Sequence, residues 1–224
     1  MIQRFKDRYE AGRSLAWSLK HLAHRNDVIV LALPRGGVPV AFEVARALEA
    51  PMDVFIVRKL GVPGHEELAM GAIAPGDILV LNNEVIRYLE ISPAVIDYVA
   101  RNERRELERR DRLYRGSRPP QELAGRIVIL VDDGLATGST MRAAVSAVRQ
   151  RRPARIVVAV PVGASSTLKE MEKEADEVVA VLSPEPFEGV GRWYDDFSQT
   201  NDDEVRCLLG LSTNHKPGPA RAIA

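Results

Sequence analysis

Two adjacent acids and a loop of small residues stand between an apolar run and a helical pattern in the segment from Arg126 to Arg149. The apolar run ends at Asp132 and Asp133, so we expect both carboxylates at the carboxyl edge of a buried parallel strand, where open α/β sheets bind ligands. Carboxylates at such an edge are suited to binding hydroxyl groups or a metal ion.

The loop after this acidic pair, Gly134 to Thr140, offers several backbone N–H groups and three hydroxyls at the start of a helix. The amino end of a helix favours an anion such as a phosphate. The combination suits a ligand with vicinal hydroxyls beside a phosphate, as in a ribose 5-phosphate. The alternative is a strand-to-helix turn that merely begins with two acids.

The stretch Val131 to Thr140, VDDGLATGST, resembles the 5-phosphoribosyl-1-pyrophosphate (PRPP) motif of type I phosphoribosyltransferases. By this resemblance Asp132 and Asp133 hold the ribose hydroxyls, and the loop wraps the 5-phosphate. The loop residues expected to contact the ligand are Gly134, Ala136, Thr137, Gly138, Ser139 and Thr140.

Two other segments fit a doubly phosphorylated sugar. Leu33 to Val38, LPRGGV, joins Arg35 to Gly36 and Gly37 after another apolar run, and it resembles the pyrophosphate loop of the same family. Glycines let backbone N–H groups approach an anion closely. Without a ligand, the same turn would be purely structural.

Arg58 and Lys59 end a further apolar run, where a basic pair would also face the crevice, and the family often places a pyrophosphate-contacting lysine there. Surface charges are the alternative. The next stretch, Gly61 to Gly76, is rich in Gly and Pro and resembles the mobile loop that closes over PRPP. Glu66 or Glu67 on it could act as acid or base toward the nucleophile, or simply be solvated.

The resemblance implies displacement of pyrophosphate from the anomeric carbon by a nitrogen nucleophile. It also implies Mg²⁺, which would meet Asp132 and Asp133 mainly through PRPP and water. Arg35 and Lys59 would stabilise the charge that develops on the leaving group. The expected catalytic residues are Asp132, Asp133, Lys59, Glu66 and Glu67.

The acceptor is expected to be a small nitrogenous compound and is less clearly indicated. Hypoxanthine-guanine members of the family carry an aspartate where this sequence has Ala136, so a 6-oxopurine is disfavoured, whereas adenine stays open. Ser183 to Phe197 is the candidate hood over the acceptor. Its aromatic residues could stack on a planar base or simply pack: Phe187, Trp193 and Tyr194.

The elements that position these residues are read from the apolar runs. Continuous runs predict strands at Val28 to Leu33, Val54 to Val57, Ile78 to Leu81, Ile127 to Val131, Ile156 to Val160 and Val178 to Val181. Helical patterns lie between several of them. The alternation predicts an α/β fold with a doubly wound, mostly parallel sheet flanked by helices, with a small hood and a helical insertion.

We expect one domain over residues 1–211 and a disordered tail over 212–224. Ser92 and Pro93 signal the start of a helix with interleaved charges, and the stretch of about 92–115 resembles an insertion relative to the smallest family members. We expect no chemistry from it, but it could serve a homodimer contact.

Composition narrows the class of protein. The 31 basic and 31 acidic residues give a formal net charge of +0, which does not favour nucleic acid or membrane surfaces as partners. Cys207 is the only cysteine, so an intrachain disulfide is excluded. The charged stretch Met1 to Glu10 carries no apolar leader pattern, and we expect a cytoplasmic protein.

Three other functions compete with that of a phosphoribosyltransferase. A PRPP-sensing regulator would retain the site with little catalysis, and turnover discriminates it from an enzyme. A PRPP synthase-like kinase would need an ATP site and an internal duplication, and neither is found. A Rossmann dehydrogenase would need a Gly-x-Gly-x-x-Gly turn after a strand, which the sequence lacks.

Overall fold

A computed structural model describes residues 4–211, so the predicted tail lies outside the described residues. The helices are α1 (Arg8–Ser18), α2 (Gly37–Leu48), α3 (Asn83–Tyr88), α4 (Pro93–Arg115), α5 (Ser139–Arg149), α6 (Ser165–Met171) and α7 (Asp202–Leu208), with single turns η1 (Lys20–Leu22) and η2 (Val190–Trp193). The strands are β1 (Val28–Ala32), β2 (Met52–Val54), β3 (Arg58–Val62), β4 (His65–Ala74), β5 (Ile78–Leu81), β6 (Ile127–Val131), β7 (Arg155–Val162) and β8 (Glu177–Leu182).

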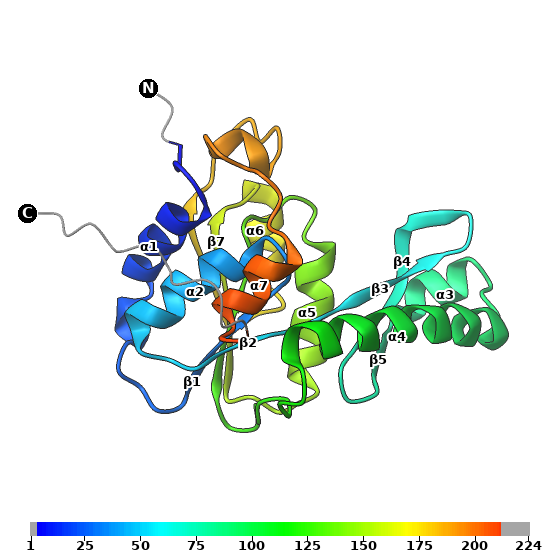
Figure 1. Cartoon of the computed structure of the whole chain (residues 1–224). Coiled ribbons are helices and arrows are strands. Elements are labelled where there is room, and N and C mark those ends of the chain that lie inside the picture. The colour runs from blue at the N-terminus through cyan, green and yellow to red at the C-terminus, as the bar shows by residue number, and fades with distance from the viewer. Residues whose placement is uncertain (1–3, 212–224) are drawn as a thin grey trace, which may run out of the picture.

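The centre of the molecule is a five-stranded sheet in the order β2-β1-β6-β7-β8, and every neighbouring pair is parallel (Figure 1). Helices α1 and α2 cover one face of this sheet, and α5 and α6 cover the other. Both faces are therefore buried, which explains why β1 and β6 read as uninterrupted apolar runs. The predicted doubly wound α/β fold is confirmed.

Two predicted strands differ in the structure. The run from Val54 to Val57 forms a sheet strand only as far as Val54, after which the chain leaves the parallel sheet and enters β3. The run from Ile78 to Leu81 is a strand, but it belongs to a separate antiparallel sheet in the order β3-β4-β5. Apolar content predicted a strand correctly without indicating which sheet it joins.

The prediction that Gly61 to Gly76 forms a loop is wrong, because most of this segment forms the β3–β4 hairpin, whereas its closure over a ligand stays a prediction. Pro63 and Gly64 make the turn, and Gly64 adopts a positive φ of 81° that suits glycine. Arg58 pairs with Ile73 and Lys59 with Ala72 before the register shifts at Gly61. The Gly-rich composition of this segment predicted a loop because composition alone does not show which residues pair as strands.

The small sheet projects beside the parallel sheet together with α3 and α4, and we call these five elements the arm (Figure 1). Helix α4 begins as predicted, with the Ser92 hydroxyl accepting from the Val95 N–H at 3.4 Å. Leu60 and Val62 of β3 share a core cluster with Leu107 of α4, whereas other residues of the small sheet join the cluster of α5. The small sheet is thus held between two helices.

A buried ion pair ties the arm to the edge of the parallel sheet. The Arg115 guanidinium at the end of α4 contacts the Asp53 carboxylate of β2 and donates to the Val54 carbonyl at 3.1 Å. Both side chains are almost fully buried. Because a buried charge without a partner is costly, this pair fixes where α4 ends on the sheet.

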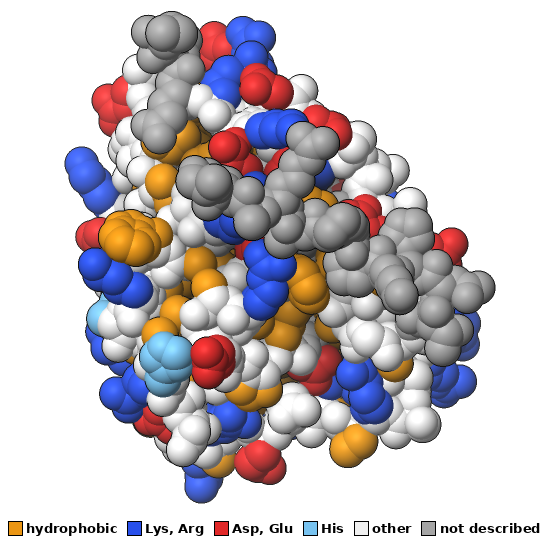
Figure 2. Space-filling model, turned by 60° about the vertical axis from the view of Figure 1, so that its left-hand side comes forward, with side chains coloured by type: hydrophobic (Ala, Val, Ile, Leu, Met, Phe, Trp, Pro, Cys, Tyr) orange, Lys and Arg blue, Asp and Glu red, His pale blue; other side chains and the backbone are white. Residues whose placement is uncertain are grey.

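Figure 2 shows basic and acidic side chains interspersed on one face of the molecule, in line with the balanced composition. Within residues 4–211, none of the helices combines the length and apolar character needed to cross a membrane.

We expect Arg115→Met to lower the free energy of unfolding by about 3 to 5 kcal/mol, because Asp53 would keep a buried charge without its partner. Urea unfolding followed by circular dichroism measures this loss. Arg112→Met is the matched control, since Arg112 lies on the exposed side of the same helix and meets Glu108 only at 3.9 Å. Its expected change is below roughly 1 kcal/mol. Equal losses in the two variants would contradict a special role for the buried pair.

Candidate active site

The acidic pair follows β6 directly at the carboxyl edge of the parallel sheet, as predicted. The Asp133 N–H donates to the Asp132 carboxylate at 2.9 Å. Burial raises the pKa of Asp132 well above its usual value, and the neighbouring Asp133 charge adds to the rise. Burial also raises the pKa of Asp133, although Arg8 opposes the effect. The edge therefore presents two carboxylates that are costly to ionise together.

The glycine loop after β1 lies directly against this pair. The Leu33 N–H donates to the Val131 carbonyl at 2.9 Å, which continues the β1–β6 pairing into the loop. A Cβ on Gly36 would collide with the Asp133 carboxylate, and one on Gly37 would lie 2.6 Å from the Val131 carbonyl oxygen. Only glycine fits at these two positions, so the two segments singled out in the sequence form one site.

The loop after the acids is anchored on its far side by β7 and α6. The Leu135 N–H donates to the Val162 carbonyl at 2.9 Å, and the Thr167 hydroxyl donates to the Ala136 carbonyl at 2.6 Å. Gly138 has a positive φ of 75° and starts α5, where the first N–H groups of a helix have no partner within it. Thr137 and Ser139 place their hydroxyls 3.4 Å apart beside this helix start. The loop leads into a helix start, which is a favourable place for an anion, and the binding of a phosphate there stays a prediction.

Arg8, on α1, is a site residue that sequence reasoning missed. Its Nε and Nη2 atoms each lie 2.8 Å from Oδ2 of Asp133, and Nη1 donates to the Ser198 carbonyl at 2.6 Å. The guanidinium also lies 4.1 Å from the centroid of the Phe197 ring. The separation of 125 residues explains the omission, since nothing in the local pattern around Arg8 points to Asp133.

The predicted hood, residues 183–197, lies over the acidic loop. The Tyr194 hydroxyl donates to the Asp133 carbonyl at 2.6 Å, and the Tyr194 ring packs between Phe5 and Phe197 at centroid distances of 5.6 and 5.1 Å. Val190 lies where a side chain on Gly134 would be. Tyr194 is buried by these contacts, so here the packing alternative holds for its ring.

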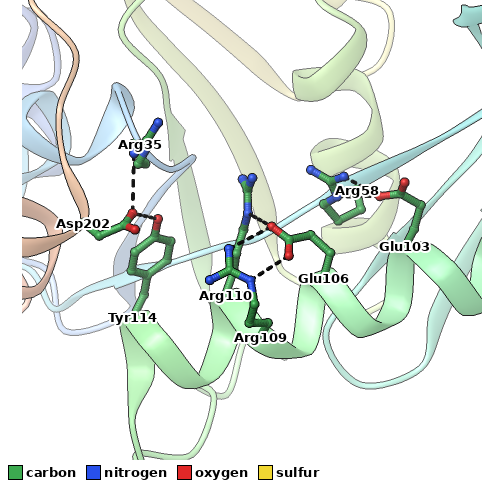
Figure 3. Close-up of polar contacts among 8 residues, drawn as sticks. All are labelled: Arg35, Arg58, Glu103, Glu106, Arg109, Arg110, Tyr114 and Asp202. Carbon is green, nitrogen blue, oxygen red and sulfur yellow. Dashed lines mark hydrogen bonds and ion pairs between the residues drawn. The ribbon is translucent and has the colours of Figure 1, made fainter.

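The basic residues at the start of β3 separate. Arg58 forms two contacts of 2.6 Å with the Glu103 carboxylate on α4 (Figure 3). Successive side chains of a strand point to opposite faces, so Lys59 lies on the face turned to α5. The prediction that both residues face one crevice is wrong because strand alternation divides them. The predicted contact of Lys59 with an anion stays a prediction.

Arg35 extends from the glycine loop toward α4 and α7. Its Nη1 atom lies 3.6 Å from Oδ1 of Asp202, the first residue of α7, and the Tyr114 hydroxyl donates to the same carboxylate (Figure 3). Burial and Asp202 raise the pKa of Tyr114 to about 12, so this hydroxyl stays protonated and acts as a donor.

Glu66 and Glu67 lie at the start of β4, by the turn of the hairpin. The Gly64 N–H donates to the Glu66 carboxylate at 3.2 Å, and backbone hydrogen bonds lower the pKa of this side chain. In this conformation Glu66 stabilises the turn. Its catalytic role, like that of Glu67, stays a prediction that requires the hairpin to approach the acidic pair.

The parallel sheet thus carries an acidic pair and two glycine-containing loops at its carboxyl edge, and comparison with known proteins shows the family to which this arrangement belongs. The sequence model of the phosphoribosyl transferase domain family matches residues 79–191, about half of the chain. The chain belongs to the phosphoribosyltransferase family, whose enzymes are pentosyltransferases.

Two Mycobacterium tuberculosis proteins, each named "Putative phosphoribosyl transferase", are 47% identical to the chain over 205 residues. The alignment covers 92% of this chain and 46% of each relative, so the chain spans about half the length of these curated relatives. A protein named bifunctional protein PyrR from Brevibacillus brevis is 33% identical over 52% of this chain and 67% of its own length.

The crystal structure of TT1426 from Thermus thermophilus superimposes on the chain with a TM-score of 0.85 and 44% sequence identity. The match covers 93% of this chain and 98% of the other. The likeness therefore extends over most of the chain.

We expect Arg8→Met to cost about 3 kcal/mol of unfolding free energy at pH 7, because Asp133 would lose its partner in a buried setting. The raised pKa of Asp133 means that protonation favours the folded state, a contribution present at low pH and lost as the pH rises through that pKa. Without Arg8 the pKa rises further. The difference between wild type and variant should therefore shrink as the pH falls toward 4.

Urea unfolding at pH 7 and pH 4 measures both differences. Arg25→Met is the control, because Arg25 pairs with Asp27 at an exposed position. A cost for Arg8→Met that is the same at both pH values would contradict this account of the pair.

Proposed function

We propose that this chain is a phosphoribosyltransferase that binds PRPP with Mg²⁺ and transfers the 5-phosphoribosyl group to a small nitrogenous acceptor. The observation that carries the proposal is the direct contact between the glycine loop and the acidic pair, where Gly36 lies against Asp133. A hydroxyl-binding pair and two anion-binding loops then share one edge of the sheet, which matches the distribution of groups along PRPP.

In the proposed complex, Asp132 and Asp133 accept hydrogen bonds from the ribose hydroxyls. The residues from Ala136 to Thr140 surround the 5-phosphate at the start of α5. Arg35 and Lys59 approach the pyrophosphate from the glycine loop and from β3. Because Arg58 is held by Glu103, we assign it no contact with the ligand in this conformation.

The reaction breaks the bond between the anomeric carbon and the pyrophosphate oxygen and forms a bond from that carbon to the acceptor nitrogen. Pyrophosphate leaves with the electron pair, and the acceptor nitrogen gives up a proton. Arg35 and Lys59 stabilise the charge that builds on the leaving group. Glu66 or Glu67 would take the proton if the hairpin closes over the ligand, and closure would also exclude water from the reacting carbon.

The donor set fits Mg²⁺ held largely by the ligand. Asp132 and Asp133 supply carboxylate oxygens, but two Arg8 nitrogens already contact Oδ2 of Asp133. Within residues 4–211 no cluster of three or more His, Cys, Asp or Glu side chains is arranged to hold a metal ion. Mg²⁺ readily retains waters and binds substrate phosphates, and when bound it neutralises charge on the pyrophosphate.

The proposed acceptor is a nitrogenous base other than a 6-oxopurine, since Ala136 replaces the aspartate expected for that class. Adenine stays open. Phe187 and Trp193 are the remaining aromatic candidates of the hood, because the Tyr194 ring is already packed against Phe5 and Phe197. We also propose a cytoplasmic homodimer without nucleic acid or membrane partners, and size-exclusion chromatography with light scattering tests the dimer.

Calorimetric titration should show PRPP binding that strengthens with Mg²⁺. We expect the double variant Asp132→Asn, Asp133→Asn to lose at least tenfold in affinity, since amides accept weaker hydrogen bonds than carboxylates from the ribose hydroxyls. Asp97→Asn, at an exposed position of α4, is the control and should bind as the wild type does. A wild-type protein that does not bind PRPP would refute the proposal.

Turnover separates an enzyme from a PRPP-sensing regulator. With PRPP, Mg²⁺ and a panel of nitrogenous bases, we expect one base to give pyrophosphate release well above the rate without base. Lys59→Gln should reduce that rate at least tenfold, because it removes the positive charge that stabilises the leaving group. Tight PRPP binding without release for any base in the panel would instead favour the regulator.

A further inference from the structure

The C-terminal segment, residues 183–209, contacts the proposed site at two places, the ribose end of the site and its pyrophosphate end. At the ribose end, the Tyr194 hydroxyl donates to the Asp133 carbonyl, and the Ser198 carbonyl accepts from Arg8. At the pyrophosphate end, Asp202 reaches Arg35. Asp202 lies beyond the residues matched by the family model, which end at 191. Arg35 precedes the matched residues, so both partners of this contact lie outside the family match.

The Asp202 carboxylate is held in place from behind. Tyr114, which is 2% exposed and projects from α4, donates its hydroxyl to Oδ1 of Asp202. Asn201 caps α7 by accepting from the Glu204 N–H at 2.8 Å, and the Tyr9 hydroxyl of α1 donates to the Glu204 carboxylate at 2.9 Å. Helix α7 is thus tied to α1 and α4, and its first residue presents a fixed negative charge to Arg35.

The Arg35 side chain is held less firmly than the Asp202 carboxylate. The 3.6 Å distance between Arg35 Nη1 and Asp202 Oδ1 exceeds a hydrogen-bond length, and the two side chains are 34% and 43% exposed. No hydrogen bond from the Arg35 side chain to another described residue is found. An exposed ion pair of this kind is weak and easily exchanged for a stronger anion. A pyrophosphate carries more charge and more acceptor oxygens than one carboxylate.

We propose that Asp202 is a positioning residue that occupies Arg35 in the ligand-free protein and competes with pyrophosphate for it. This inference rests on the proposed function, since it takes Arg35 as a pyrophosphate contact. Asp202 keeps the guanidinium at the glycine loop before PRPP arrives. It also replaces the pyrophosphate on Arg35 when the product leaves, which lowers the affinity for pyrophosphate.

Calorimetry with Mg²⁺ and inorganic pyrophosphate tests the competition. We expect Asp202→Asn to bind pyrophosphate about threefold more tightly, the size expected when an exposed ion pair no longer has to be broken. The amide oxygen of the variant still accepts from Tyr114, so the helix should stay in place. Asp202→Glu retains the charge and should restore an affinity within about twofold of the wild type.

Asp203→Asn is the matched control. It removes the same charge one residue further along α7, where the Asp203 side chain is 92% exposed and meets Arg206 only at 4.0 Å. Its pyrophosphate affinity should stay at the wild-type value. Equal tightening in Asp202→Asn and Asp203→Asn would show a general charge effect and overturn the proposal.

A double-mutant cycle shows whether Asp202 acts through Arg35. Arg35→Gln should weaken pyrophosphate binding, and adding Asp202→Asn to that variant should change the affinity no further. If Asp202→Asn raises the pyrophosphate affinity as much in the Arg35→Gln background as in the wild type, the proposal is overturned even though the wild type binds PRPP. If the wild type binds neither PRPP nor pyrophosphate, the proposed function itself fails, and the role of Asp202 fails with it.

Discussion

The contact between Arg8 and Asp133 is the interaction on which the site depends. Burial at the strand end raises the pKa of both carboxyls, and the charge of Asp133 adds to the rise for Asp132, so the two are costly to ionise together. Arg8 offsets this cost with two nitrogens on Oδ2 of Asp133. The same guanidinium holds the Ser198 carbonyl, so α1 and the C-terminal segment are positioned by the charge of the acidic pair. A metal ion would have to share this carboxylate with Arg8, which favours hydroxyl binding by the pair.

The arm is the second constraint, and it acts through the direction in which β3 leaves the parallel sheet. Arg115 and Asp53 fix the end of α4 on β2, and the small sheet is then held between α4 and α5. This arrangement determines which face of β3 is turned toward α4 and which is turned toward α5. Arg58 meets Glu103 on α4, whereas Lys59 is turned toward the helix whose amino end forms the phosphate loop. The long charged helix therefore holds one of the two neighbouring cations, Arg58, in an ion pair.

The family match and the site cover different parts of the chain. Residues 79–191 contain the acidic pair and the phosphate loop, but the glycine loop lies outside this range, as do Arg8 and Asp202. They contact the site at its ribose and pyrophosphate ends, respectively. TT1426 matches 93% of the chain with a TM-score of 0.85, so this likeness extends well beyond the residues of the family match.

The sequence by itself determined the local chemistry. The acids after β6, the small residues before α5 and the paired glycines after β1 are contiguous patterns, and their physical meaning depends only on neighbours within a few residues. The order of apolar runs likewise determined the doubly wound fold. Tertiary structure decided what depends on distant partners: the pairing of β5 with β4, the separation of Arg58 from Lys59, and the contacts of Arg8 and Asp202 across 125 and 167 residues. Ion pairs carry no sequence periodicity, so only the folded chain shows which charges meet.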